Sequence, residues 1–172
     1  MMRDGTPNGY SYITFNGTSY IIDWKVSGKS EKYRMNIHTP RGVSEEASAS
    51  TNITVNFFNG SEQSELSFRV LGETGWNKME KVSDQDPYYS LIYERFGDFN
   101  LIKLKDQWEN DPELKNKPYP LIKRMYEASN STHLWQSKIG KNLTEGIHVI
   151  EVKAKDRYDR EFKDFHTLRI VK

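Results

Sequence analysis

Alternation of apolar and polar residues is clearest in the last third of the chain. A short polar corner at 156–159 separates two alternating stretches. A period of two is typical of a strand that buries one face, and two such strands joined by a short corner form an antiparallel hairpin. We therefore expect residues 146–171 to form a hairpin that covers a core. The residues at every second position are His148, Ile150, Val152, Ala154, His166, Leu168 and Ile170.

The first part of the chain shows the same pattern in shorter runs. Two runs rich in aromatic and branched residues flank Asn16-Gly17, a pair that favours a tight hairpin turn. A first hairpin is therefore expected over 10–26. The polar run 44–50 is expected to be a mobile loop. Further strands are expected at 33–38, 53–58, 66–71 and 76–79, and again from 133.

The region 83–130 departs from this pattern and is expected to be a partly helical insertion. Asp86 is suited to cap a helix, Pro87 fits the first helical position, and Gly97 is placed to end the helix. The whole chain, 1–172, is thus predicted to be one all-β domain, an immunoglobulin-like antiparallel β-sandwich that carries this insertion.

The amino-acid composition indicates which residues fill the core and argues against several classes of function. The chain has 172 residues, the length of one domain, and its 10 Tyr, 8 Phe and 4 Trp supply much of the apolar bulk. The net charge of +1 gives no strong field for nucleic acid or for a membrane surface. Because cysteine is absent, disulfides, thiolate metal ligands and a cysteine nucleophile are excluded.

The two ends of the chain lead to an expectation about its context. No apolar run reaches the roughly 20 residues of a membrane span. The first residues carry no signal-peptide pattern and run straight into a turn. A chain that begins in a turn and ends on a strand is expected to be a domain of a longer protein.

Residues that carry chemistry do not assemble into a catalytic or metal-binding pattern. The four histidines form no closely spaced pair, whereas a zinc or two-metal site needs several clustered ligands. His148 and His166 lie in alternating strands and are expected to be inward-facing or half-buried. Neither a Gly-rich phosphate loop nor a nucleophile turn occurs. We therefore expect no catalytic residue, no metal ligand and no cofactor in this chain.

The tryptophans leave two interpretations open. Trp24, Trp76, Trp108 and Trp135 are either core and rim aromatics of the sandwich or a platform on which a sugar stacks. Trp108 lies in a polar stretch, so it is the foremost candidate for ligand stacking.

Three segments, taken in order, are similar to a known family. They are 4–10 (Asp-Gly-Thr-Pro-Asn-Gly-Tyr), 55–61 (Val-Asn-Phe-Phe-Asn-Gly-Ser) with Trp76, Met79 and Asp86-Pro87 after it, and 131–135 (Ser-Thr-His-Leu-Trp) followed by 146–152. Together they resemble the C-terminal domain of bacterial calcineurin-like metallophosphoesterases, over essentially the whole chain.

The resemblance implies a catalytic domain ahead of this chain, with a two-metal centre that hydrolyses phosphate esters. The ligand motifs of that centre do not occur in this sequence, so divalent metals are implied only for the catalytic domain. The chain itself is expected to be a non-catalytic accessory domain that packs on the catalytic domain or shapes access to its site. The resemblance also implies an exported or periplasmic bacterial protein. The net charge of +1, in turn, leads us to expect no nucleic-acid partner.

The start of the chain is expected to lie nearest to that catalytic domain. Its glycine and proline residues impose a fixed turn, which is either an ordinary entry into the first strand or part of a domain interface. The segment 131–135 is expected to line the same interface. The predicted interface residues are Asp4, Pro7, Asn8, Tyr10, His133 and Trp135.

Two other functions fit the sequence. A carbohydrate-binding module needs two or three aromatic side chains exposed on one face or groove. An adhesion or assembly domain needs an exposed strand edge or an apolar patch.

Overall fold

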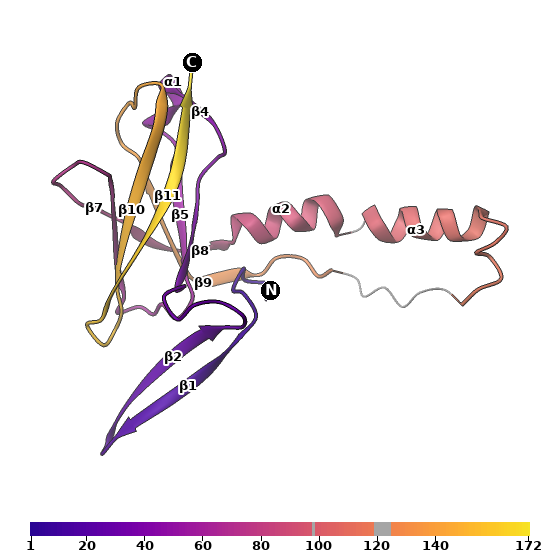
Figure 1. Ribbon diagram of the computed structural model, residues 1–172, viewed down its shortest axis with the longest axis horizontal. Coiled ribbons are helices and arrows are strands. Elements are labelled where there is room, and N and C mark those ends of the chain that lie inside the picture. Colours follow the sequence, from indigo (N-terminus) through magenta and orange to yellow (C-terminus); the bar gives the residue numbers. More distant parts are fainter. Residues whose placement is uncertain (98, 119–124) are drawn as a thin grey trace.

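A computed structural model describes residues 1–97, 99–118 and 125–172, and within it two β-sheets pack face to face (Figure 1). The described strands are β1 (Gly9–Asn16), β2 (Ser19–Val26), β3 (Met35–His38), β4 (Val43–Ser44), β5 (Asn52–Phe57), β6 (Glu65–Val70), β7 (Asn77–Lys78), β8 (Glu80–Gln85), β9 (Asn130–Lys138), β10 (Gly146–Lys155) and β11 (Glu161–Val171). The described helices are α1 (Glu45–Ser48), α2 (Pro87–Phe96) and α3 (Phe99–Asn110).

The strands of the sandwich fall into a sheet of four and a sheet of five. The four-stranded sheet has the order β3-β5-β9-β8, and the five-stranded sheet has the order β4-β11-β10-β6-β7. Neighbouring strands are antiparallel except for the short parallel pair of β4 with β11. The pair β1–β2 forms a separate two-stranded sheet that projects from one end of the sandwich, and α2 and α3 extend away from its side (Figure 1).

The core lies between the two sheets and follows the alternation in the sequence. Ile150, Val152 and Ala154 of β10 are fully buried, and Leu168 and Ile170 of β11 join them. β6 of the same sheet adds Phe68, and the inner faces of β5 and β9 in the four-stranded sheet supply the opposing residues, including Trp135.

The predicted all-β sandwich with a partly helical insertion is confirmed. The first hairpin turns at Asn16-Gly17, and the last hairpin spans the predicted residues. His148 and His166 are half-buried, as expected. The immunoglobulin-like connectivity and the single-domain reading of 1–172 stay predictions.

The helix of the insertion begins where the sequence indicated. Asp86 accepts hydrogen bonds from the backbone N–H groups of Tyr88 and Tyr89, Pro87 takes the first helical position, and Gly97 follows the last turn of α2. The predicted boundary at residue 83 is less accurate, because β8 continues to Gln85 and pairs with β9. A second helix, α3, precedes the next proline and was not predicted.

The prediction of a mobile loop at 44–50 is wrong. The Ser44 side chain accepts a hydrogen bond from the Ala47 N–H and caps the one-turn helix α1. The Ser48 hydroxyl is buried, donates to the Glu45 carbonyl and accepts from the Leu143 N–H. The small polar residues at these positions therefore form hydrogen bonds with backbone groups at the end of a sheet. Their composition alone resembles that of a loop.

Candidate functional site

Two of the predicted interface residues meet at the point where the chain enters the sandwich. Asp4 Oδ2 lies 3.2 Å from Nε2 of His133, which is carried by β9. The Thr6 hydroxyl lies 3.2 Å from the same ring nitrogen, and the Thr6 N–H donates to Asp4 Oδ1 at 3.0 Å. The first residues of the chain are thus bound to β9, which lies more than 120 residues later in the sequence.

Asn56 of β5 connects this contact to the interior. Its Nδ2 donates to the Asp4 carbonyl at 3.1 Å and to Asp86 Oδ2 at 2.9 Å. Both partners can only accept, so the amide orientation is determined and Oδ1 faces His133 Nδ1 at 2.8 Å. The two ring nitrogens of His133 thus face two acceptors, the Asn56 amide oxygen at Nδ1 and the carboxylate of Asp4 at Nε2.

The electrostatics of Asp4 reflect this environment. The hydrogen bond from His133 lowers the pKa of Asp4 to about 2, and the hydrogen bonds from Thr6 act in the same direction, although partial burial opposes them. Asp4 is therefore charged throughout the physiological range, and its carboxylate is bonded by the neighbouring Thr6 and by the distant His133.

Asp86 is the most deeply buried carboxylate of the cluster. Burial acts to raise its pKa, but the contacts with His38 and Asn56 and the backbone N–H of Tyr89 together hold the pKa below its ordinary value. His38 Nε2 lies 3.2 Å from Asp86 Oδ2 but, among the described residues, makes no well-aligned hydrogen bond. Asp86 thus caps α2 with one oxygen and joins β3 and β5 with the other.

Gly5 allows the first residues to lie against this carboxylate. Its φ is +82°, a conformation that favours glycine, and a Cβ at this position would be 2.1 Å from Asp86 Cγ. On the other side, Arg3 Nε donates to the Glu127 carbonyl at 2.8 Å, and the Ser129 N–H donates to the Arg3 carbonyl at 3.0 Å. We call the cluster of Asp4, Thr6, Asn56, Asp86 and His133 the N-terminal junction.

The chemistry of the N-terminal junction is that of a structural connection. Asn56 and Asp86 are fully buried and Thr6 is 2% exposed, so a substrate has no access to them. Among the described residues, no group of three or more His, Cys, Asp or Glu side chains is arranged to hold a metal ion. The polar atoms are paired with one another, and the arrangement holds the entering chain in one conformation.

Three members of the N-terminal junction, Thr6, Asn56 and Asp86, were not predicted as interface residues from the sequence. Asp86 was predicted only as a helix cap, and no sequence pattern indicated that its second carboxylate oxygen would bond Asn56. Asn56 stands in the middle of the apolar strand 53–58, and a buried polar residue in such a strand indicates a specific partner. The sequence thus indicated that Asn56 has a hydrogen-bond partner, but not which residue this partner is.

The other predicted interface residues lie at the base of the first hairpin or in the core. The Asn8 carbonyl accepts from the Ser27 N–H at 3.0 Å and closes the hairpin, and Tyr10 is exposed just beyond it. Pro7 is half-buried between the junction and the hairpin. Trp135 is 1% exposed and packs edge-on against Phe57, so its side chain belongs to the core.

The remaining tryptophans occupy three different environments. Trp76 lies in cation–π contact with Arg69, at 4.5 Å, and with Lys153, at 4.8 Å. Trp24 is half-buried in β2. Trp108 is half-buried at the end of α3, and its ring N–H donates to the Lys117 carbonyl at 3.2 Å. Its role in ligand stacking stays a prediction.

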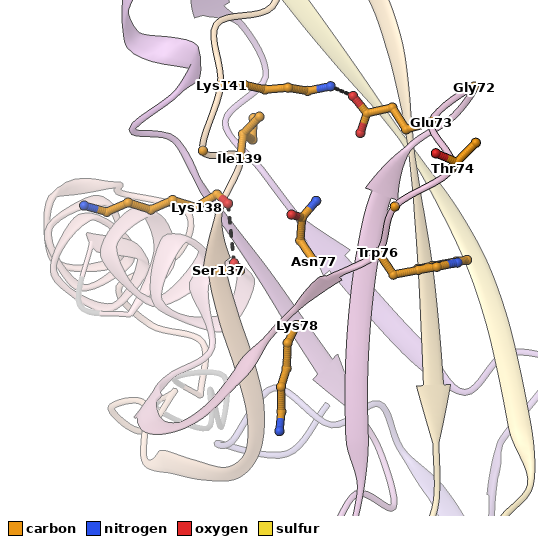
Figure 2. Close-up of a pocket in the computed structure, with 12 residues that line it drawn as sticks. Gly72, Glu73, Thr74, Trp76, Asn77, Lys78, Ser137, Lys138, Ile139 and Lys141 are labelled. Carbon is orange, nitrogen blue, oxygen red and sulfur yellow. Dashed lines mark hydrogen bonds and ion pairs between the residues drawn. The ribbon is translucent and has the colours of Figure 1, made fainter.

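A broad groove lies elsewhere, between the turn before β7 and the end of β9 (Figure 2). Its volume is about 690 Å³, and an ion pair between Lys141 and Glu73 closes one side. Lys78 and Lys138 on its walls are exposed. Among these lining residues, no nucleophile is paired with a base.

A comparison with family models adds the decisive observation. The model described as the C terminal of calcineurin-like phosphoesterase matches residues 1–162. The chain belongs to this family. No curated protein and no solved structure matches the chain. Among the described residues, no helix of this calcineurin-like phosphoesterase C-terminal domain is long and apolar enough to cross a membrane.

Proposed function

We propose that this chain is a non-catalytic accessory domain of a larger calcineurin-like phosphoesterase, here called the parent enzyme, and that it packs on the catalytic domain. The family match supports the position of the domain at the C-terminal side of a phosphoesterase. The divalent metals and the hydrolysis of phosphate esters belong to the catalytic domain in this proposal. An exported or periplasmic bacterial location is part of the same proposal.

The observation that carries the packing role is the N-terminal junction. A covalent linker alone leaves two domains free to move relative to one another. Here the entering chain is bound through Asp4 to His133 and Asn56, and through Arg3 to Glu127 and Ser129. These bonds restrict the direction in which the chain leaves the sandwich, and this direction in turn orients the preceding domain.

A hydrolase assay tests the non-catalytic part of the proposal. The isolated chain is incubated with p-nitrophenyl phosphate and bis-p-nitrophenyl phosphate in the presence of Mn²⁺ or Zn²⁺. We expect no release of nitrophenol above the buffer control, whereas the parent enzyme releases it under the same conditions. Sustained turnover by the isolated chain, retained through purification, would contradict the proposal.

A further inference from the structure

The two-stranded hairpin β1–β2 exposes several large apolar side chains to solvent. Phe15 is 72% exposed, and Ile13 and Tyr20 are each 50% exposed. An isolated two-stranded hairpin is marginally stable in water at best. Contiguous apolar surface of this kind on a folded protein marks an interaction site.

The strand register places these side chains on one face. Ile13 pairs with Ile22, and Phe15 pairs with Tyr20. The rings of Phe15 and Tyr20 lie 6.3 Å apart, so the two residues form a continuous surface. We call Ile13, Phe15, Tyr20 and Ile22 the hairpin apolar face.

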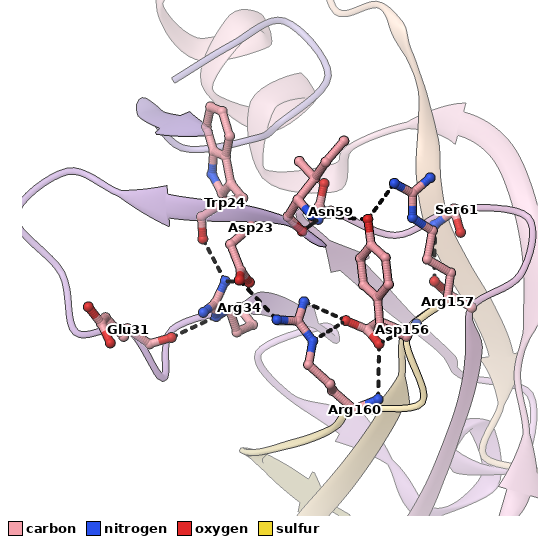
Figure 3. Close-up of polar contacts among 12 residues, drawn as sticks. Asp23, Trp24, Glu31, Arg34, Asn59, Ser61, Asp156, Arg157 and Arg160 are labelled. Atoms are coloured by element: carbon pink, nitrogen blue, oxygen red, sulfur yellow. Dashed lines mark hydrogen bonds and ion pairs between the residues drawn. The ribbon is translucent and has the colours of Figure 1, made fainter. Parts of the chain in front are cut away.

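The opposite face of the hairpin is attached to the sandwich at its base. Asp23 accepts from Arg34 at 3.0 Å and from Arg160 at 2.9 Å, and Arg160 also binds Asp156 (Figure 3). The Arg34 side chain donates to the Trp24 carbonyl as well. These bonds hold the base of the hairpin while the hairpin apolar face extends beyond it.

One edge of the hairpin is also bound to the sandwich, and the other is free. The Ile22 N–H donates to the Tyr158 hydroxyl at 3.0 Å, and the Ile22 carbonyl accepts from Asn59 at 2.9 Å. The backbone N–H and carbonyl of Ile22 therefore point away from β1. In an antiparallel pair the residue opposite such a position also points its N–H and carbonyl away from its partner strand. Ile13, which pairs with Ile22, thus points these groups away from β2. In the part of the chain that the structure describes, nothing outside the hairpin bonds to the backbone of Ile13.

We infer that the hairpin apolar face and the free edge of β1 are the docking surface for the calcineurin-like catalytic domain of the parent enzyme. This inference rests on the proposed function and specifies the element that makes the contact. The occupant follows from the path of the chain. Thr6, a member of the N-terminal junction, is followed closely by β1, which begins at Gly9. A domain joined to residue 1 is therefore tethered beside the hairpin (Figure 1). Tethering at short range gives this domain a high effective concentration at that surface.

Amide hydrogen exchange in the parent enzyme and in the isolated chain tests the inference. We expect the amides of Ser11, Ile13 and Phe15 to exchange at least roughly tenfold more slowly in the parent enzyme, because docking covers the edge of β1. Phe15→Ser in the parent enzyme is expected to return these amides toward the rates of the isolated chain. Phe165→Ser is the matched control, since Phe165 is 55% exposed on β11 of the sandwich.

The possible outcomes separate this inference from the proposed function. Protection confined to another surface, such as α2, overturns the docking role of the hairpin and leaves packing on the catalytic domain intact. Equal exchange everywhere in the two proteins overturns both. Protection of the hairpin in the isolated chain that grows with concentration assigns the surface to a second copy, which also overturns the inference.

Discussion

At the residue scale, the N-terminal junction shows how a few polar side chains connect distant parts of the chain. Asn56 serves three partners at once, because its amide bonds Asp4 and Asp86 while its oxygen faces His133. Buried groups with complete pairing are costly to disturb, because removing one partner leaves the others desolvated.

The depressed pKa of Asp4 predicts a specific dependence of stability on pH. The folded-state pKa of about 2 lies below the ordinary value of 3.8, so the stabilising contribution is complete above about pH 5 and is lost as the pH falls toward 2. Asp4→Asn is expected to lower the free energy of unfolding by about 1–2 kcal/mol at pH 7. The difference from wild type should disappear near pH 2, as measured by urea denaturation at several pH values.

Asp159→Asn is a suitable control for this experiment. Asp159 is exposed and pairs with Lys155 at the surface, where solvent screens such pairs and they contribute little to stability. We expect little change in stability from this variant. A loss for Asp4→Asn that is equally large at pH 2 and at pH 7 would show that the carboxylate charge is not involved.

Gly5 and Gly17 provide a matched test of the close approach to Asp86. Both have positive φ, but a Cβ at Gly17 meets nothing within 4 Å, whereas a Cβ at Gly5 overlaps the Asp86 side chain. Gly17→Ala is expected to cost about 1 kcal/mol from backbone strain alone. Gly5→Ala is expected to cost about 3 kcal/mol or more, because it also displaces a buried carboxylate. Equal losses in urea denaturation contradict the packing described at Gly5.

We expect His166 to cause a second dependence of stability on pH, nearer to neutrality. Burial lowers the pKa of His166 below 6.5, and the neighbouring His38 acts in the same direction, while Asp164 opposes it. The Thr39 hydroxyl lies 2.9 Å from the ring. A lowered histidine pKa gives stability that is complete above about pH 6.5 and is lost below it. His166→Gln should therefore flatten the decline of stability between pH 7 and 5, and an unchanged decline would assign it to other groups.

At the element scale, the strands were predictable where alternation is strong and hidden where polar residues dominate. The last hairpin alternates over both strands and was predicted in place, and Asp86-Pro87 marked the start of α2. In contrast, β8 reads Glu-Lys-Val-Ser-Asp-Gln and lies on the edge of its sheet, so it buries little and shows no pattern. Residues 44–50 likewise depend on tertiary hydrogen bonds that local composition does not reveal.

The attachment of the first hairpin also gives a testable prediction at this scale. Asp23→Asn removes the charge that Arg34 and Arg160 share, so Arg34 loses its carboxylate partner while Arg160 keeps Asp156. We expect amides in the first hairpin to exchange roughly tenfold faster while core amides of β10 keep their rates. Ser19→Ala, an exposed change on the same strand, is expected to have no such effect. Unchanged exchange after Asp23→Asn would mean that other contacts hold the hairpin.

At the scale of the whole molecule, the domain combines a buried core with elements that project from the sandwich. The sandwich core is one continuous cluster of buried apolar residues, whereas the hairpin apolar face is exposed and the helices α2 and α3 extend from the side (Figure 1). The sequence resemblance predicted the family, and the family match confirms it. The N-terminal junction was only partly predictable, because contacts between Asp4, Asn56 and His133 depend on how three separate segments meet.

Small-angle X-ray scattering of the parent enzyme tests the central claim most directly. If this chain packs on the catalytic domain, the two domains scatter as one compact particle with a fixed separation between their centres. Disruption of the N-terminal junction by His133→Ala should increase the radius of gyration and broaden the distribution of distances. Wild-type scattering that fits two domains moving independently on a linker would contradict the account.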